Sequence, residues 1–233
     1  MNAVLEARKL RKVYQGGDGR PLEILSGLDL AVRRGEFVAV VGASGSGKTT
    51  LLHLLGALDE PTDGAVLLDG ISYQAMSADA LAELRNRKIG FVFQFHHLLR
   101  EFTAIENVML PLLIAMVPEA TARSKAEELL ALVGLAGRMN HRPTELSGGE
   151  QQRVAVARAL ATEPLVVLAD EPTGNLDHGN GERLHELFAS LASQFETALV
   201  VATHNRLLAD RADRVLSLED GRLVPRSGAE AVS

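Results

Sequence analysis

An eight-residue stretch, GASGSGKT (42–49), limits the possible folds of this chain more than any other. It follows EFVAVV (36–41), a short β-branched run, and leads into TTLLHLLGAL (49–58), which is apolar on all sides. This matches the pattern G-x-x-x-x-G-K-[ST] in the context that it requires, with a strand before and a helix after. The glycines let backbone N–H groups surround phosphate oxygens, and the helix N-terminus adds partial positive charge. The stretch therefore predicts a phosphate-binding loop.

Further β-branched runs recur along the chain, with helical patterns between them. They are IGFVF (89–93), LVVLAD (165–170) and ALVVAT (198–203). This alternation indicates an α/β fold, a P-loop core with a mainly parallel sheet. The first 30 residues and GAVLLDG (64–70) have the pattern of shorter strands with glycine turns, which predicts an antiparallel edge.

Residues 95–160 differ from the rest, because they contain helical patterns and no strand-like run. In SKAEELLALVGL (124–135), Gly134 is the expected stop signal. We therefore expect one domain: a nucleotide-binding core (1–94 and 161–224), an inserted, mostly helical subdomain (95–160), and a frayed tail (225–233).

Composition excludes several kinds of site. The chain has no Cys, so disulfides and thiolate metal sites are impossible. A net charge of −6 argues against a nucleic-acid-binding face. The longest apolar run, VMLPLLIAMVP (108–118), is too short to cross a bilayer, which needs about 20 residues. We expect a soluble chain that reaches a membrane only through a partner.

Charged and polar residues gather at the phosphate loop and at the ends of two later strands. Lys48 supplies a full charge to the β- and γ-phosphates, and the Thr49 hydroxyl can ligate Mg²⁺. Asp170 and Glu171 end a buried strand at the sheet edge where α/β folds bind ligands, so we expect Asp170 to hold Mg²⁺, directly or through one of its ligands, and Glu171 to act as the base for attacking water. His204 ends the next strand and can contact the γ-phosphate. The loop residues expected to bind nucleotide are Gly42, Ala43, Ser44, Gly45, Ser46, Gly47, Lys48, Thr49 and Thr50.

A second glycine motif, LSGGEQQR (146–153), combines Ser147 as an N-cap with Gly148, Gly149 and a following helix. Alone it is either a second anion site or merely a capped helix. With it, the chain closely resembles the ATP-binding-cassette (ABC) family over residues 3 to about 224. LSGGE resembles the signature motif of that family, and DEPTGNLD (170–177) its Walker B and D-loop.

The resemblance implies an ATPase coupled to transport, with ATP and Mg²⁺ bound between the P-loop of one chain and the signature of a second copy in a head-to-tail dimer. It implies that Tyr14 stacks on adenine, that Asp177 joins the nucleotide site together with Ser147, Gly148 and Gly149, and that His204 is the switch histidine. Gln94 would contact Mg²⁺ and sense integral-membrane permease subunits, which are separate chains. Asn205 stands where many relatives have Asp, so the dimer contact from that position is open.

The stretch FQFHHLLREF (93–102) has three interpretations. His96 and His97 could bind a metal, although adjacent His side chains diverge and Glu101 is the only nearby carboxylate. The phenylalanines could simply pack the strand end. We favour the third interpretation, in which residues 95–102 receive a short permease helix and Gln94 links this contact to ATP.

The same region suggests a subgroup. FQFHHLLREFTAIENVMLPLL and MNHRPTELSGGE resemble the ATPases of lipoprotein-releasing systems in Gram-negative bacteria, although Arg100 stands where such chains usually have Pro. The resemblance implies ATP-driven release of lipoproteins from the inner membrane toward a periplasmic carrier, by a peripheral subunit on the cytoplasmic face. One alternative is the ATPase of a related exporter of the macrolide-efflux or cell-division type, which shares PTGNLD. A cytosolic ABC ATPase without a transport role is a more distant alternative, because this chain has neither paired cassettes nor a long coiled-coil insertion.

Overall fold

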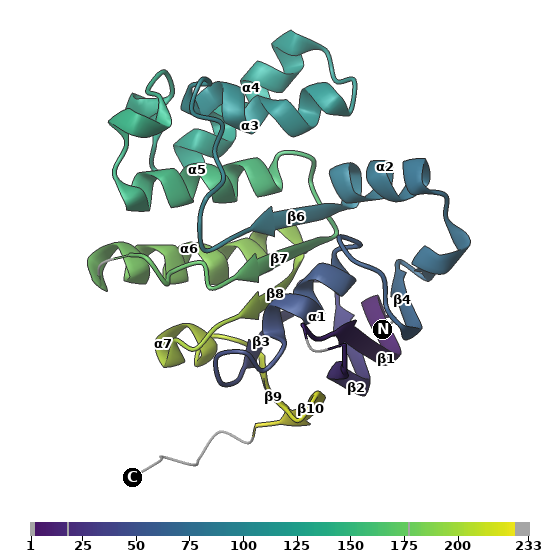
Figure 1. Cartoon of the computed structure of the whole chain (residues 1–233). Helices are drawn as coiled ribbons and strands as arrows, with labels where there is room; N and C mark the ends of the chain where they lie inside the picture. Colours follow the sequence, from purple (N-terminus) through teal and green to yellow (C-terminus); the bar gives the residue numbers. More distant parts are fainter. Residues whose placement is uncertain (1–2, 18, 177, 227–233) are drawn as a thin grey trace.

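The computed structural model describes residues 3–17, 19–176 and 178–226, and it contains two sheets with helices around them (Figure 1). The larger sheet has the strand order β10-β9-β3-β8-β7-β6. All its neighbours pair in parallel except β9 and β10. The predicted α/β class with a mainly parallel sheet is confirmed. The strands of this sheet are β3 (Phe37–Val41), β6 (Ile89–Val92), β7 (Val166–Asp170), β8 (Ala198–Ala202), β9 (Arg214–Glu219) and β10 (Arg222–Pro225).

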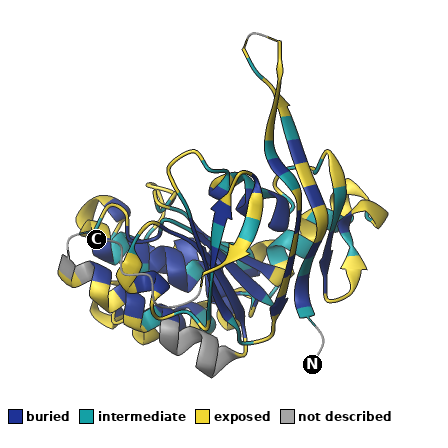
Figure 2. Ribbon diagram, turned by 90° about the horizontal axis from the view of Figure 1, so that it is seen from below, coloured by how far each residue is buried: buried dark blue, intermediate teal, exposed yellow. Residues whose placement is uncertain are grey.

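The smaller sheet is antiparallel, with the order β2-β1-β4-β5. The segments expected at the edge of the main sheet form this second sheet instead, and the first two strands have 13 residues each rather than being short. Several register shifts between β1 and β2 interrupt the apolar alternation and hide the length of these strands in the sequence. The β1–β2 hairpin projects from the body of the molecule (Figure 2). The strands of this sheet are β1 (Ala3–Gln15), β2 (Pro21–Arg33), β4 (Asp63–Leu68) and β5 (Ile71–Ser72).

The helices lie on both sides of the larger sheet. They are α1 (Lys48–Leu55), α2 (Ala78–Lys88), α3 (Ala104–Ile114), α4 (Glu119–Leu132), α5 (Gly148–Leu160), α6 (His178–Phe195) and α7 (Arg206–Ala209), with short 3-10 helices at Tyr73–Ala75, Ala136–Arg138 and Pro143–Glu145. Residues 95–160, all of them described, contain α3, α4 and α5 and no strand. The division into core, helical subdomain and tail stays a prediction. Gly134 has φ 73 just beyond α4, which confirms the expected stop signal.

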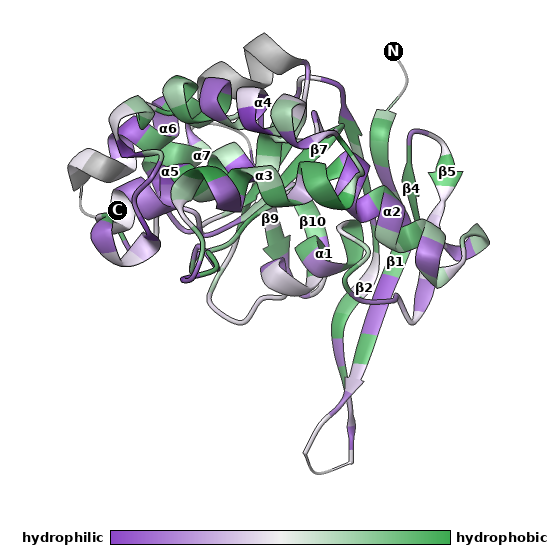
Figure 3. Cartoon of the chain, turned by 90° about the horizontal axis from the view of Figure 1, so that it is seen from above, coloured by the Kyte–Doolittle hydropathy of each residue, from purple (hydrophilic) through white to green (hydrophobic). Residues whose placement is uncertain are grey.

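Two apolar clusters lie on opposite faces of the larger sheet. The strands of this sheet are mostly hydrophobic, as their green colour shows (Figure 3). In β3, Val38 and Val40 join the cluster with α1 and the smaller sheet, whereas Phe37 joins the cluster with α3, α4 and α5. β3 and β8 are buried along their whole length, as strands covered on both faces must be. This packing fixes the carboxyl ends of β3, β7 and β8 at one edge. Among the described residues, no helix is both long and apolar enough to cross a membrane.

The last strand of the larger sheet lies at the boundary of the expected tail. The expected tail begins inside β10, because Val224 and Pro225 still pair with Ser217 and Leu216 of β9. Residues 227–233 lie outside the described part of the chain.

Candidate active site

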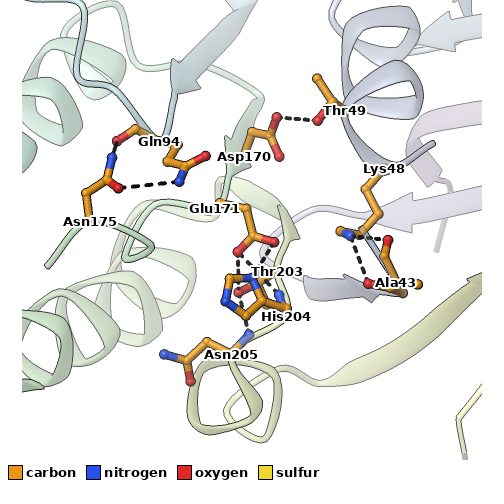
Figure 4. Close-up of polar contacts among 11 residues, drawn as sticks. Ala43, Lys48, Thr49, Gln94, Asp170, Glu171, Asn175, Thr203, His204 and Asn205 are labelled. Carbon is orange, nitrogen blue, oxygen red and sulfur yellow. Dashed lines mark hydrogen bonds and ion pairs between the residues drawn. The ribbon is translucent and has the colours of Figure 1, made fainter. Parts of the chain in front are cut away.

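The loop between β3 and α1 is shaped by its glycines. Gly45 and Gly47 have φ values of 79 and 103, a left-handed backbone that favours glycine. Gly47 is the N-cap of α1 and supplies no side-chain hydrogen bond, so the first N–H groups of the helix are left for a ligand. The Lys48 ammonium donates to the carbonyls of Gly42 (2.9 Å) and Ala43 (3.0 Å), and it is held at the loop (Figure 4). This combination can bind phosphate.

A cavity of about 560 Å³ opens at this loop. Apart from Ile24, every residue of its wall is among those predicted from the sequence. The volume lies within the range of small-molecule sites. The lining residues are Ile24, Ser44, Gly45, Gly47, Lys48, Thr49, Thr50, Gln94, Asp170, Glu171 and His204.

Oxygen ligands for a cation meet on one side of the cavity. The Thr49 hydroxyl donates to Asp170 Oδ2 at 2.7 Å (Figure 4). Burial raises the pKa of Asp170, and the Thr49 hydroxyl partly opposes this by lowering it. Hydroxyl, carboxylate and the Gln94 amide are hard donors that fit Mg²⁺, which is usually bound by one or two carboxylates together with substrate phosphates. The described residues contain no cluster of three or more His, Cys, Asp and Glu side chains that could hold a metal alone. That result also leaves the metal interpretation of His96 and His97 without geometric support.

Glu171 is held in an unusual conformation at the end of β7. Its φ of 42 is left-handed, and its N–H donates to the carbonyl of Ala202 at 2.9 Å. Its carboxylate accepts hydrogen bonds from the Thr203 hydroxyl at 3.2 Å and from the His204 backbone N–H at 3.3 Å. His204 Nδ1 lies 2.9 Å from Glu171 Oε1 (Figure 4). A strained backbone held by several contacts is a common device for aiming a functional side chain.

Two contacts in the site were missed in the sequence. Asn175 donates from Nδ2 to the Gln94 carbonyl at 3.2 Å, and its Oδ1 lies 3.5 Å from Gln94 Nε2. Thr203 supports Glu171, as described above. Both residues stand inside or beside motifs that were identified, since Asn175 belongs to DEPTGNLD and Thr203 precedes His204. The sequence motifs include or adjoin these residues, but they do not indicate which residues their side chains contact.

The remaining predicted residues do not line this cavity. Gly42, Ala43 and Ser46 face a neighbouring hollow beside Gly221. Ser147, Gly148 and Gly149 start α5 and do not line the phosphate cavity of their own chain. Ser147 is confirmed as an N-cap, because its side chain accepts from the Glu150 N–H at 3.3 Å. Asp177 lies outside the described residues.

Tyr14 and Asn205 have other partners. The Tyr14 hydroxyl donates to Asp59 at 2.6 Å, and Tyr14 is not part of the cavity wall. Asn205 caps α7, accepting from the N–H groups of Leu207 (2.9 Å) and Leu208 (3.4 Å). The residue at the departure from the family pattern therefore has a local structural role.

The loop after Gln94 is attached to the helices that follow it. Arg158 of α5 donates to the carbonyls of His96 and His97, both at 2.8 Å. The fully buried Asn107 of α3 accepts from the Leu99 N–H at 2.9 Å and donates to the Leu99 carbonyl at 3.1 Å. A loop held in this way presents a defined surface.

Exposure separates the interpretations of FQFHHLLREF by residue. Leu98 is 6% exposed and belongs to the apolar core, contrary to its expected place on a docking surface. Phe95 is 65% exposed and Leu99 45% exposed. The core interpretation therefore holds for Leu98, whereas Phe95 and Leu99 are the side chains accessible to a partner.

Comparison with known proteins identifies the family. A model described as ABC transporter matches residues 25–174. The lipoprotein-releasing system ATP-binding protein LolD of Legionella pneumophila (strain Paris) is 50% identical over 223 residues, covering 96% of this chain and 98% of that protein. LolD of Bordetella pertussis is 53% identical, covering 95% of each chain. LolD of Geobacter metallireducens is 52% identical, covering 96% of this chain and 99% of its own.

Solved structures agree in fold. The dimeric structure of a post-hydrolysis state of the ATP-binding cassette MJ0796 bound to ADP and Pi matches with a TM-score of 0.86 and 39% identity, covering 94% of this chain and 96% of that one. Another dimeric structure of MJ0796, a bacterial ABC transporter cassette, has the same TM-score and coverage at 40% identity. The chain therefore belongs to the ABC transporter family, as one of its ATP-hydrolysing cassettes.

Proposed function

We propose that this cassette powers the release of lipoproteins from the inner membrane toward a periplasmic carrier, as a peripheral subunit on the cytoplasmic face. The observation that carries the proposal is identity of about half over nearly the full length with LolD proteins of different bacteria. The loop and signature stretches that suggested this subgroup lie within the matched span.

The roles of the site residues follow from their positions. Lys48 and the N–H groups of α1 bind the phosphates. Glu171, aimed by Thr203 and His204, accepts a proton from the attacking water, and the His204 side chain reports the presence of the γ-phosphate. Thr49, Asp170 and Gln94 would hold Mg²⁺, which supplies charge neutralisation at the phosphates when it is bound.

A second copy completes the site. Ser147 and Gly148 are exposed, and they do not line the phosphate cavity of their own chain. In a head-to-tail dimer they would meet the γ-phosphate bound to the partner's P-loop, an arrangement supported by the dimeric cassettes of the same fold. Because each γ-phosphate would then bridge two chains, its loss on hydrolysis removes charge-assisted hydrogen bonds and opens the dimer.

The permease docks beside the Gln94 loop. A mostly apolar groove of about 430 Å³ runs between α2, α3 and β6, with Phe91, Phe93, Pro111 and Ile114 in its wall. Together with the exposed Phe95, this groove can receive a short helix of a membrane subunit through its apolar face. Gln94 lies in the wall of the nucleotide cavity and at the start of the same loop. Permease binding to the loop is therefore linked to the presence of nucleotide in the cavity.

Replacing both Phe95 and Leu99 with Ala tests this docking site. The isolated cassette should fold and hydrolyse ATP normally, whereas co-purification with the permease subunits should fall at least about tenfold, as for loss of interface anchors. Leu132→Ala is the matched control, because Leu132 is 41% exposed on α4 away from the groove. Unchanged assembly of the double variant would exclude these anchors.

Depletion of this chain in its own bacterium tests the function as a whole. Membrane fractionation should find lipoproteins retained in the inner membrane, with rescue by the wild-type chain but not by Glu171→Gln. Normal lipoprotein localisation in depleted cells would instead favour a related exporter.

A further inference from the structure

A carboxylate beyond the end of α1 holds two residues of β1. Lys12 and Tyr14 are two positions apart and therefore lie on the same face of the strand. Asp59 Oδ1 lies 2.7 Å from the Lys12 ammonium, and Asp59 Oδ2 accepts from the Tyr14 hydroxyl at 2.6 Å. One carboxylate thus fixes both side chains at once.

The lysine also covers part of the tyrosine. The Lys12 ammonium lies 4.7 Å from the centre of the Tyr14 ring and donates to the Glu60 carbonyl at 2.6 Å. Lys12 is only 8% exposed, whereas Tyr14 is 37% exposed. The ring is therefore held by polar contacts at its hydroxyl and at one face, and the rest of its apolar surface is open to a planar ligand.

The strand segment opposite Tyr14 lies beside the phosphate cavity. Tyr14 pairs with Leu22 of β2, and Ile24, two residues further along β2, lies in the wall of that cavity and packs against Gly47. Helix α1 carries Lys48 at its start, and Asp59 follows shortly after its end. One short helix therefore sets both the phosphate end and the tyrosine.

We propose that Asp59 is a positioning residue for nucleotide binding, which orients the Tyr14 ring against the purine base and keeps Lys12 on the ring. The proposal rests on the proposed function in so far as ATP binds at the P-loop. Asp59 touches Tyr14 and not the nucleotide, so it acts on affinity and leaves the chemical step alone.

The test is a double-mutant cycle on ATP binding, with Tyr14→Phe, Asp59→Asn and the double variant. Tyr14→Phe removes the hydrogen bond to Asp59, and Asp59→Asn leaves one acceptor oxygen for both Tyr14 and Lys12. Each change should raise the Kd of ATP about 3- to 10-fold, and the double variant should bind no more weakly than Asp59→Asn alone. Steady-state kinetics should give a matching rise in KM with kcat unchanged. Tyr14→Ala, which removes the stacking ring, sets the upper limit.

Tyrosine emission gives a second readout. The chain has no Trp and two Tyr, and Tyr73 is buried with its hydroxyl bonded to the Leu55 carbonyl at 2.9 Å. A change in emission on adding ATP should therefore come from Tyr14 and disappear in Tyr14→Phe. Asp63→Asn is the matched control, because Asp63 is an exposed carboxylate at the start of β4.

The outcomes are distinct. Normal binding by Asp59→Asn and Tyr14→Phe, with weak binding by Tyr14→Ala, would overturn the role of Asp59. Normal binding by Tyr14→Ala would overturn both that role and the stacking of the base on Tyr14, while ATP hydrolysis and lipoprotein release by the wild type would still stand. If Asp59→Asn fails to fold because Lys12 loses its partner, Tyr14→Phe decides alone, since it leaves the ion pair intact.

Discussion

The N-termini of α1 and α5 both lie in glycine-containing motifs, but their backbone N–H groups are satisfied differently. At α1, Gly47 provides no side-chain cap and Lys48 adds a fixed cation beside the free N–H groups. At α5, Ser147 and Glu150 form a capping box that already satisfies part of the helix end, and hydrogen bonds from Ser147 lower the pKa of Glu150. We therefore expect the first helix end to bind phosphate by itself, and the second to supplement a phosphate that is held elsewhere.

The largest expected effect is a loss of ATP hydrolysis at the phosphate site beside α1. Glu171→Gln keeps the shape of the side chain but removes its basicity, so ATP should still bind while hydrolysis falls by about 10²- to 10⁴-fold. The bound, unhydrolysed ATP should then hold the dimer closed, and light scattering with Mg-ATP would detect this dimer. Hydrolysis close to the wild-type rate would remove Glu171 from the role of base.

The next effect concerns α5. A Cβ on Gly148 would meet no atom within 4 Å in the isolated chain, so Gly148→Asp should fold and its monomer should bind ATP normally. In a dimer the new carboxylate would face the γ-phosphate of the partner site, at a cost of about 4 kcal/mol for charges roughly 4 Å apart near a surface. Hydrolysis and ATP-driven dimerisation should both be lost. Gly137→Asp is the control, because it also meets nothing within 4 Å and lies outside the signature motif.

Removing the cap itself should have a smaller effect. Ser147→Ala takes away the bond to the Glu150 N–H, which should lower the free energy of unfolding by about 1 kcal/mol. Urea denaturation of the isolated chain measures this loss. A stability equal to that of the wild type would mean that the Ser147 hydroxyl adds nothing to the stability of α5.

The smallest expected effect is an increase in stability, caused by Asp170→Asn. Burial raises the pKa of Asp170, so at neutral pH its ionised carboxylate is less favourable in the folded chain than in the unfolded chain and lowers the free energy of unfolding. Asp170→Asn should therefore raise the melting temperature of the nucleotide-free chain at pH 7, and this gain should shrink as the pH falls through the raised pKa. The same variant should bind Mg-ATP weakly. A lower melting temperature at pH 7 would show that the bond to Thr49 outweighs the cost of burial.

The parts of the fold that the sequence predicted are those with continuous patterns. β3, β7 and β8 are buried on both faces and therefore have nearly continuous apolar sequences, and the P-loop has a specific motif. β1 and β2 alternate buried and exposed positions and shift register, so their length was underestimated. α2 has no fully buried residue, and it therefore lacks the apolar stripe by which a helix is predicted.

The contacts that were missed join residues distant in sequence. Asp59 bonds to Tyr14 across 45 positions, and Asn175 to Gln94 across 81. Neither pairing leaves a local pattern. Leu98 was misplaced for a related reason, since an apolar residue in an irregular loop has no periodicity to say which way it points.

The attachment of the Gln94 loop to α3 and α5 has a consequence for local unfolding. The amide of Leu99 bonds to the fully buried Asn107, so it should be exposed to hydrogen exchange only when α3 itself opens. We therefore expect the loop and the helices that hold it to open as one cooperative unit, although the loop has no regular secondary structure. A displacement of Phe95 by a bound partner should then also move α5, because Arg158 of α5 is hydrogen-bonded to the two residues that follow Phe95.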